Sequence, residues 1–189
     1  MSLLRFYLFY RFALFLMTMI VLYSCIEINS SGFSSLSEEE KQKVKNSTNP
    51  IDSIKNDGCL YKVTAKQMGL YFKNKENVLV YEYLPFCKEA NVPAEVKQIC
   101  DEKKWDCIVI SSVYDNIFPI PLSNTFPMFV IDNSVYDTDN YQTYGNLFYA
   151  DLTNNNSDER VMGTLHLFHK GKYKCSYTSI NEVIDYRPQ

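Results

Sequence analysis

An almost continuous apolar run from Val78 to Tyr83 is the feature that most constrains how this chain folds. Only Glu82 within the run is charged. Strands with one solvated face alternate apolar and polar residues, whereas strands covered on both faces are apolar throughout. The run therefore predicts a central strand, in a sheet that carries helices on both sides.

Helix and strand signals surround this run in a regular order. The expected elements are a strand at 60–63, a helix with a capping box at Thr64 and Gln67, the central strand, a helix from Val92 to Cys100 with Pro93 in its first turn, strands at 107–110 and 128–131, a hairpin at 164–177 around Lys170-Gly171, and a short helix that begins after Ser179. No helix is assigned to the segment between 132 and 159, which is rich in Asp, Asn and Tyr. The order is β-α-β-α-β, followed by a hairpin and a helix.

This order resembles the thioredoxin-like fold, and two segments strengthen the resemblance. Val78–Cys87 is similar to the strand that leads to the active cysteine of thioredoxins, with Phe86 where their tryptophan stands. Val161–Lys172 is similar to their Ile-Pro-Thr, apolar run and Lys-Asn-Gly-Glu segment. The resemblance implies a three-layer α/β/α sandwich with a central mixed sheet over residues 57–189, and an insertion after the third strand at about 116–160.

In this resemblance Cys87 occupies the position of the attacking, catalytic thiol. Dithiol exchange needs a stabilised thiolate and a second thiol that resolves the mixed disulfide. The departures are Ala90 at the resolving position, Gly163 at the cis-proline, Tyr81 at the buried acid, and Pro93, which starts the next helix several residues after Cys87. Glu82, next to Tyr81, should point to the opposite face of the strand. Cys87 is therefore either an unreactive loop thiol or a monothiol nucleophile resolved by a distant cysteine such as Cys59 or Cys175.

The first 25 residues have the organisation of a secretory signal. Arg5 and Arg11 precede an uncharged stretch, 12–23, that is shorter than the roughly 20 residues a membrane span needs. The ending Leu22-Tyr23-Ser24-Cys25 resembles the lipobox of bacterial lipoproteins. That resemblance implies a signal peptide at 1–24 and a lipidated, palmitate-bearing Cys25. The alternative is an uncleaved amphipathic or membrane helix with an incidental cysteine.

Residues 25–56 are expected to form a lipidated flexible tether, because they are rich in Ser, Asn, Lys and Glu and poor in aromatic side chains. Ser37 and Glu40 form a capping-box pattern for a short polar helix through Lys45. No apolar stripe is present to hold such a helix against the domain.

Five cysteines remain once Cys25 is lipidated, and an odd number allows at most two disulfides and one free thiol. No pair has the Cys-x-x-Cys spacing. Cys100 and Cys107 have apolar neighbours, which favours the interpretation that they are small buried hydrophobic residues. The pairing among Cys59, Cys87, Cys100, Cys107 and Cys175 is left open.

Other candidate sites are weaker. His166 and His169 lie three residues apart on an expected strand and so face opposite sides, which prevents them from sharing a metal directly. Three acidic residues could bind calcium, but a solvated turn is the favoured interpretation. A group of aromatic residues could form a binding platform, but a small core of the insertion is the favoured interpretation. These residues are Asp132, Asp137 and Asp139, and Tyr136, Tyr141, Tyr144, Phe148 and Tyr149. No metal or cofactor is expected.

Charge and composition narrow the function further. The net charge is −3, and removal of the two arginines of the signal lowers it to −5, which does not suit nucleic-acid binding. The sequence thus predicts a lipid-anchored protein of a bacterial cell envelope. Its divergent thioredoxin-like domain would be a non-enzymatic binding or accessory module for an envelope protein or peptide. The alternative is a monothiol redox protein that uses Cys87. Ile26, where some lipoproteins carry a retention Asp, favours a periplasm-facing position on the outer membrane.

Overall fold

The computed structural model describes residues 32–48, 50–85, 92–115, 117–118, 126–154 and 164–186. These residues form a mixed sheet of seven strands in the order β1-β2-β5-β4-β3-β6-β7. The strands are β1 (Val44–Asn46), β2 (Leu60–Val63), β3 (Asn77–Glu82), β4 (Asp106–Ser111), β5 (Met128–Ile131), β6 (Leu165–His169) and β7 (Lys172–Tyr177). The first five strands of the sheet are parallel to one another, and β6 and β7 form an antiparallel hairpin beside β3.

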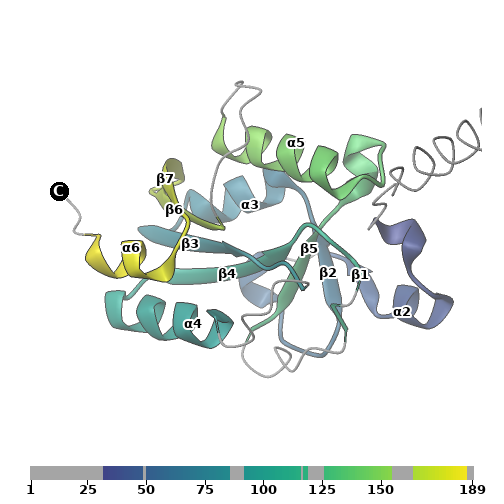
Figure 1. Cartoon of the computed structure of the whole chain (residues 1–189), viewed down its shortest axis with the longest axis horizontal. Helices are drawn as coiled ribbons and strands as arrows, with labels where there is room; N and C mark the ends of the chain where they lie inside the picture. The colour runs from purple at the N-terminus through teal and green to yellow at the C-terminus, as the bar shows by residue number, and fades with distance from the viewer. Residues whose placement is uncertain are drawn as a thin grey trace, which may run out of the picture.

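Helices cover both faces of the sheet, which confirms the α/β sandwich (Figure 1). The helices are α2 (Glu38–Gln42), α3 (Ala65–Phe72), α4 (Val92–Lys103), α5 (Tyr141–Thr153) and α6 (Ile180–Asp185), with short 3-10 turns η1 (Phe33–Ser35), η2 (Ile51–Ser53) and η4 (Asn133–Tyr136). In Figure 1, α3 and α5 lie on one face, and α4 and α6 lie on the other. Among the described residues, no helix combines the length and the apolar character that a bilayer span requires.

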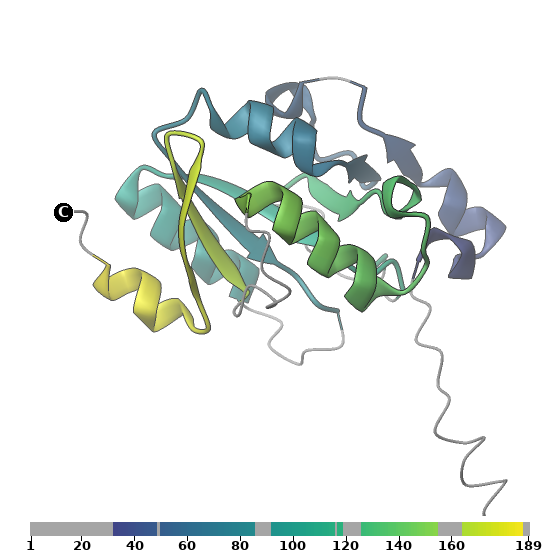
Figure 2. The ribbon, with the colours of Figure 1, turned by 90° about the horizontal axis from the view of Figure 1, so that it is seen from above.

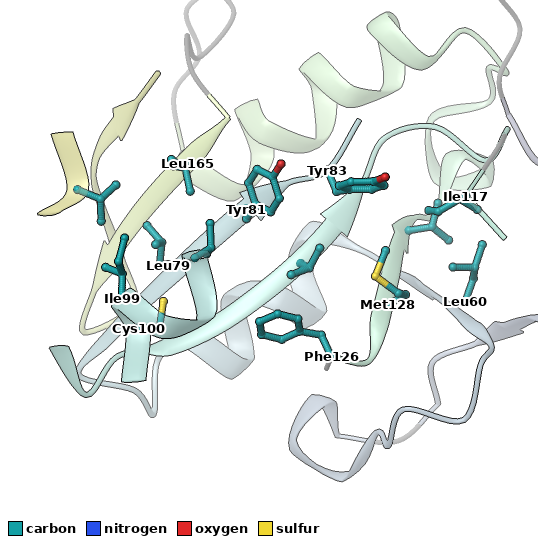
Figure 3. Close-up of a cluster of buried hydrophobic side chains, with 14 of the residues drawn as sticks. Leu60, Leu79, Tyr81, Tyr83, Ile99, Cys100, Ile117, Phe126, Met128 and Leu165 are labelled. Atoms are coloured by element: carbon teal, nitrogen blue, oxygen red, sulfur yellow. The ribbon is translucent and has the colours of Figure 1, made fainter. Parts of the chain in front are cut away.

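The two faces carry separate hydrophobic cores, and β3 contributes to both. Leu79 and Tyr81 pack toward α4 and α6, whereas Val78 and Val80 pack toward α3 and α5. The core on the α4 side is drawn in Figure 3, where Leu79 lies near Ile99 and Cys100. The central position predicted for this strand is therefore confirmed.

The elements with strong local signals form where the sequence predicts them. Thr64 caps α3 by accepting a hydrogen bond from the Gln67 backbone N–H, at 3.2 Å, and the Gln67 side chain accepts one from the Thr64 backbone N–H, at 2.8 Å. The hairpin turns at Lys170 and Gly171, both with positive φ, as a tight two-residue hairpin requires. The predicted strands at 107–110 and 128–131 correspond to β4 and β5.

The expected insertion at 116–160 supplies an internal strand and a helix. β5 lies between β2 and β4 and pairs in parallel with each. All four of its residues are buried, which fits a strand that has neighbours on both edges and helices on both faces. Helix α5 then covers β5 and its neighbours, although no helix was predicted there (Figure 2).

The prediction that residues 25–56 form a flexible tether is wrong for residues 32–48 and 50–56, which the structure describes. The capping box between Ser37 and Glu40 forms, but α2 ends at Gln42. The chain then adds β1 to the edge of β2, so that the Leu60 N–H donates to the Lys43 carbonyl at 2.9 Å. Leu36 and Ile51 are buried in the two cores. Hydrogen bonding to an unpaired strand edge, together with these two side chains, holds a segment whose own composition is polar.

Candidate functional site

The two residues to which the sequence assigns chemistry lie outside the described part of the chain. Cys25 precedes residue 32, and Cys87 belongs to the segment 86–91 that follows β3. Gly163 is likewise outside. The structure does describe the end of β3 that precedes this segment, and β3, β4 and β5 all end at the same edge of the sheet. In open α/β sheets, ligands bind outside the carboxyl ends of the parallel strands.

A buried carboxyl group lies at this edge. Glu82 is the last residue of β3 and is only 5% exposed. The Ser112 hydroxyl donates a hydrogen bond to Glu82 Oε1 at 2.8 Å, and Ser112 is also buried. The Glu82 N–H donates to the Thr164 carbonyl at 2.7 Å, which fixes the start of β6 beside the end of β3. A buried carboxyl group with a hydroxyl partner can hold or move a proton.

Tyrosines occupy the opposite face of the same strand end. Tyr81 and Tyr83 belong to the core under α4 and form an edge-to-face pair with ring centroids 6.3 Å apart (Figure 3). Ser112, the partner of Glu82, lies on the other face, where its backbone carbonyl accepts a hydrogen bond from the Tyr144 hydroxyl of α5. The prediction that Glu82 and Tyr81 point to opposite faces is confirmed.

Two buried tyrosine hydroxyls hold the chain that leaves β4 and β5. Tyr144 donates to the Ser112 carbonyl, and Tyr114 donates to the Ile131 carbonyl at 2.7 Å. Burial raises the pKa of both phenols above its usual value. The Ser111 hydroxyl makes two further hydrogen bonds to the same stretch of chain, since it donates to the Val113 carbonyl and accepts from the Val113 N–H. The Glu82–Ser112 pair therefore has a rigid frame.

Residues 32–36, which we call the N-terminal strap, cover the neighbouring part of this edge. The centroid of the Phe33 ring lies 3.8 Å from Lys62 Nζ. The same ring contacts Tyr114 edge to face, with the two ring centroids 6.0 Å apart. Ser35 donates to Asp115 at 2.6 Å, and Ser34 donates to Asp139. Burial is the main cause that lowers the pKa of Lys62, partly opposed by Asp132 and Asp139. The strap thus joins the loops after β4 and β5 to the third residue of β2.

The structure places no cysteine of the described segments at the end of β3. Cys59 precedes β2, which is three strands from β3, and Cys175 lies in β7, two strands away on the other side. At about 4.8 Å per strand, these separations are about 14 Å and about 10 Å. Neither thiol is positioned at the strand end to resolve a disulfide formed there. Cys100 and Cys107 pack together between α4 and β4, as the hydrophobic interpretation predicts.

The two histidines engage different neighbours. His166 is buried, and its Nδ1 lies 2.7 Å from the Ser176 hydroxyl, whereas His169 Nδ1 lies 3.0 Å from Asn77 Oδ1. Within the described ranges, no group of three or more His, Cys, Asp or Glu side chains could hold a metal ion.

The three candidate calcium acids have separate structural roles. Asp132 caps η4 through Ser134, and Asp139 accepts a hydrogen bond from Asn133 Nδ2 at 2.6 Å. Asp137 ends η4 in a left-handed conformation, with φ of 51°. These contacts favour the turn interpretation of the segment over a calcium site.

The aromatic residues of 136–149 contribute to the main core. Tyr144, Phe148 and Tyr149 are buried under α5, and Tyr136 and Tyr141 pack against them. Their core interpretation is confirmed, although they cover the central sheet and not a separate core of the insertion.

A groove of about 450 Å³ lies between α3, η4 and α5. Two of its lining residues, Leu70 and Val135, are each 55% exposed, so apolar surface is uncovered there. Lys66 of α3, Lys73 directly after α3, and Asp151 of α5 lie on its walls. Figure 2 shows α3 and α5 side by side over the sheet. The groove could take up an apolar side chain of a partner.

Sequence reasoning missed Ser112 and the hydroxyls of Tyr114 and Tyr144. The sequence did contain a signal for a polar cluster, because Glu82 and Ser111-Ser112 stand at the ends of two apolar strand patterns. Parallel strands place their carboxyl ends at the same edge of a sheet. The pairing itself depends on the register between β3 and β4. Comparison with protein-family models and with curated protein sequences finds no match to this chain.

Proposed function

We propose that this protein is a lipid-anchored protein of a bacterial cell envelope, and that its α/β domain is a divergent thioredoxin-like module that binds another protein. In this proposal the lipid is on Cys25, and the domain faces the periplasm from the outer membrane. The lipobox-like ending Leu22–Cys25 supports the anchor.

The order of the elements supports the thioredoxin-like part of the proposal. Strands β2, β3 and β4, the β6–β7 hairpin and helices α3, α4 and α6 follow the order on which the resemblance rests. Helices α3 and α5 cover one face, and α4 and α6 cover the other (Figure 1). Strand β5, placed between β2 and β4, is then an addition within the sheet.

The residues at the end of β3 support a non-catalytic role for the domain. A dithiol mechanism needs a second thiol beside the attacking one. Ala90 stands at that position in the sequence, Cys59 precedes β2, and Cys175 lies in β7, and neither strand is next to β3. Tyr81, an aromatic core residue, replaces the buried acid. A binding role remains the simplest function for such a domain.

The groove between α3 and α5 is the proposed binding surface. Exposed Leu70 and Val135 offer apolar contact, and contiguous uncovered apolar surface commonly marks an interaction site. Lys66 and Lys73 outnumber the one acid, Asp151, whose carboxylate also accepts a hydrogen bond from Tyr136. The occupant is therefore a protein segment with an apolar anchor flanked by acidic residues.

Site-specific photocrosslinking in cells that make the full chain tests the binding surface. A photoreactive phenylalanine analogue at position 70 should crosslink one partner, and Val135→Asp should abolish that crosslink. The matched control is position 184, because Ile184 is 51% exposed but lies on α6, on the opposite face. Mass spectrometry should place the crosslink in an acidic segment with an apolar residue. Equal crosslinking at both positions, or none at position 70, would contradict the proposal.

The anchor and the alternative redox function are tested separately in the same cells. Labelled palmitate should enter the wild type and not Cys25→Ser. The monothiol alternative is favoured by the position of Cys87, five residues after the buried Glu82. It predicts mixed disulfides that Cys87→Ser abolishes. The binding proposal predicts that Cys87→Ser behaves as the wild type in thiol trapping and in crosslinking.

A further inference from the structure

Cys100 and Cys107 are brought together by the turn that ends α4. The Trp105 N–H donates to the Cys100 carbonyl at 2.8 Å, and the Lys104 N–H donates to the Asp101 carbonyl at 3.2 Å. Lys104 is in the left-handed conformation, with φ of 56°. This pair of bonds is the Schellman arrangement, which reverses the chain at once after a helix. The reversal returns Cys107, in β4, to the helix turn that carries Cys100.

The two thiols share one buried environment. Cys100 is 1% exposed, and Cys107 is partly buried against the same hydrophobic cluster (Figure 3 shows Cys100 beneath the sheet). A hydrogen bond between the two thiols is the largest cause that raises the pKa of Cys107, with burial second. Both cysteines are reduced in the structure, as are Cys59 and Cys175.

We propose that Cys100 and Cys107 form an intramolecular disulfide that fastens the end of α4 to β4. The two thiols lose two protons and two electrons and form one S–S bond. An external disulfide accepts the electrons and protons and is released as two thiols. The reversal of the chain and the shared hydrophobic cluster bring the two thiols within hydrogen-bond reach of each other.

The proposal settles part of the cysteine pairing that the sequence leaves open, because it pairs Cys100 with Cys107 and leaves Cys59 and Cys175 outside this disulfide. Cys59 precedes β2 and Cys175 lies in β7, and both strands are separated from β4 by other strands, so these two cysteines do not compete for either thiol. The inference does not depend on the proposed binding function or on the lipid anchor, since it concerns the α4–β4 connection alone.

Mass mapping of the full chain, purified in mild detergent, tests the disulfide. Reduced protein is equilibrated with oxidised glutathione, remaining thiols are alkylated, and the protein is digested with trypsin. Cleavage after Lys97, Lys103 and Lys104 puts the two cysteines in different peptides, 98–103 and 105–160. We expect these peptides to be joined, with the mass of two hydrogens lost, and Cys59 and Cys175 to be alkylated or glutathionylated. The thiolate is the reacting form, so the raised pKa of Cys107 calls for a long equilibration.

Thermal unfolding gives a second readout. A disulfide that closes a ring of eight residues should raise the unfolding temperature of oxidised wild type by about 5–10 °C over the reduced protein. Cys107→Ala, which retains a small apolar side chain, should lose this difference, and Cys175→Ala should keep it. Alkylation of both Cys100 and Cys107 after full equilibration, or a joined peptide that contains any other cysteine, would overturn the proposal.

Discussion

Glu82 brings a carboxyl group to a strand end where its neighbours are apolar or aromatic. Burying such a group costs free energy unless hydrogen bonds replace its contacts with water. Ser112 supplies one of those bonds, and the position of Ser112 is itself fixed by Tyr144. A polar pair held in this way at a strand end is more costly to disturb than a surface pair, because water cannot replace the lost partner.

Ser112→Ala should therefore lower the free energy of unfolding by about 1–3 kcal/mol, because it removes a donor from a buried carboxyl group. Urea unfolding of the full chain, followed by circular dichroism, measures the change. Ser53→Ala is the matched control, since the Ser53 hydroxyl bonds the Pro50 carbonyl at an exposed position and should matter by less than about 0.5 kcal/mol. Equal effects of the two substitutions would show that the Glu82–Ser112 bond contributes nothing special.

At the scale of elements, the end of α4 combines a favourable hydrogen-bond pattern with an unfavourable residue. Lys104 adopts positive φ, although a side chain in that conformation costs roughly 1 kcal/mol and glycine usually occupies it. Lys104→Gly should raise the free energy of unfolding by about 0.5–1 kcal/mol, after the entropy cost of glycine. Lys104→Ala removes the same side chain but keeps Cβ, so its stability should stay near that of the wild type. A stabilisation by alanine as large as that by glycine would assign the effect to charge and not to the backbone.

Elements with a local signal were predictable from the sequence, and elements that depend on distant partners were not. The capping box at Thr64 and the Lys170-Gly171 turn are set by interactions within a few residues. Strand β1 carries no such signal: its three residues form a strand because the edge of β2 is available to pair with them. The polar composition of that segment led to the opposite prediction.

Helix α5 was missed for a different reason. Its residues include Tyr, Asn, Thr and Gly, which are weaker helix formers than Ala or Leu. What stabilises it is tertiary contact, since Tyr144 and Phe148, four residues apart, are both fully buried, together with the Asn140 side chain that accepts from the Thr143 N–H at 3.0 Å. The Glu82–Ser112 pair was beyond sequence reasoning in the same way, because thirty residues separate its members and the register of β3 against β4 joins them.

At the scale of the whole molecule, the N-terminal strap would shorten the link between the domain and a lipid on Cys25. If Cys25 carries the lipid as proposed, seven peptide units separate it from Gly32, the first described residue of the strap. A chain of that length reaches at most about 25 Å. The carboxyl edge of β2, β4 and β5, which the strap covers, would then lie near the lipid surface, while the α3–α5 groove opens on one face of the sheet.

Tyrosine burial makes the whole fold sensitive to alkaline pH. The pKa is raised, chiefly by burial, for Tyr61, Tyr71, Tyr114, Tyr136, Tyr144 and Tyr177. A folded pKa above the unfolded value stabilises the protein fully below the unfolded pKa, and this contribution is lost as the pH rises. Lys62 acts in the opposite direction, because burial lowers its pKa and its charged form is the disfavoured one. The pKa values of Lys45 and Lys75 are raised, so these two lysines act in the same direction as the six tyrosines. The sum of these shifts is a net loss of stability in alkali.

The fold should therefore lose stability between pH 10 and pH 12, the window set by Tyr71, whose pKa burial raises from 10 to about 12. In this window the unfolded chain has released tyrosine protons that the folded chain retains, so each step in pH favours unfolding. Absorbance at 295 nm, which reports tyrosinate, should rise together with the loss of the helical circular dichroism signal. Tyr71→Phe removes one such group, and with it the hydrogen bond to Asp106, so its stability should depend less steeply on pH in this window. Complete tyrosine ionisation near pH 10 with unchanged circular dichroism would contradict the burial of these side chains.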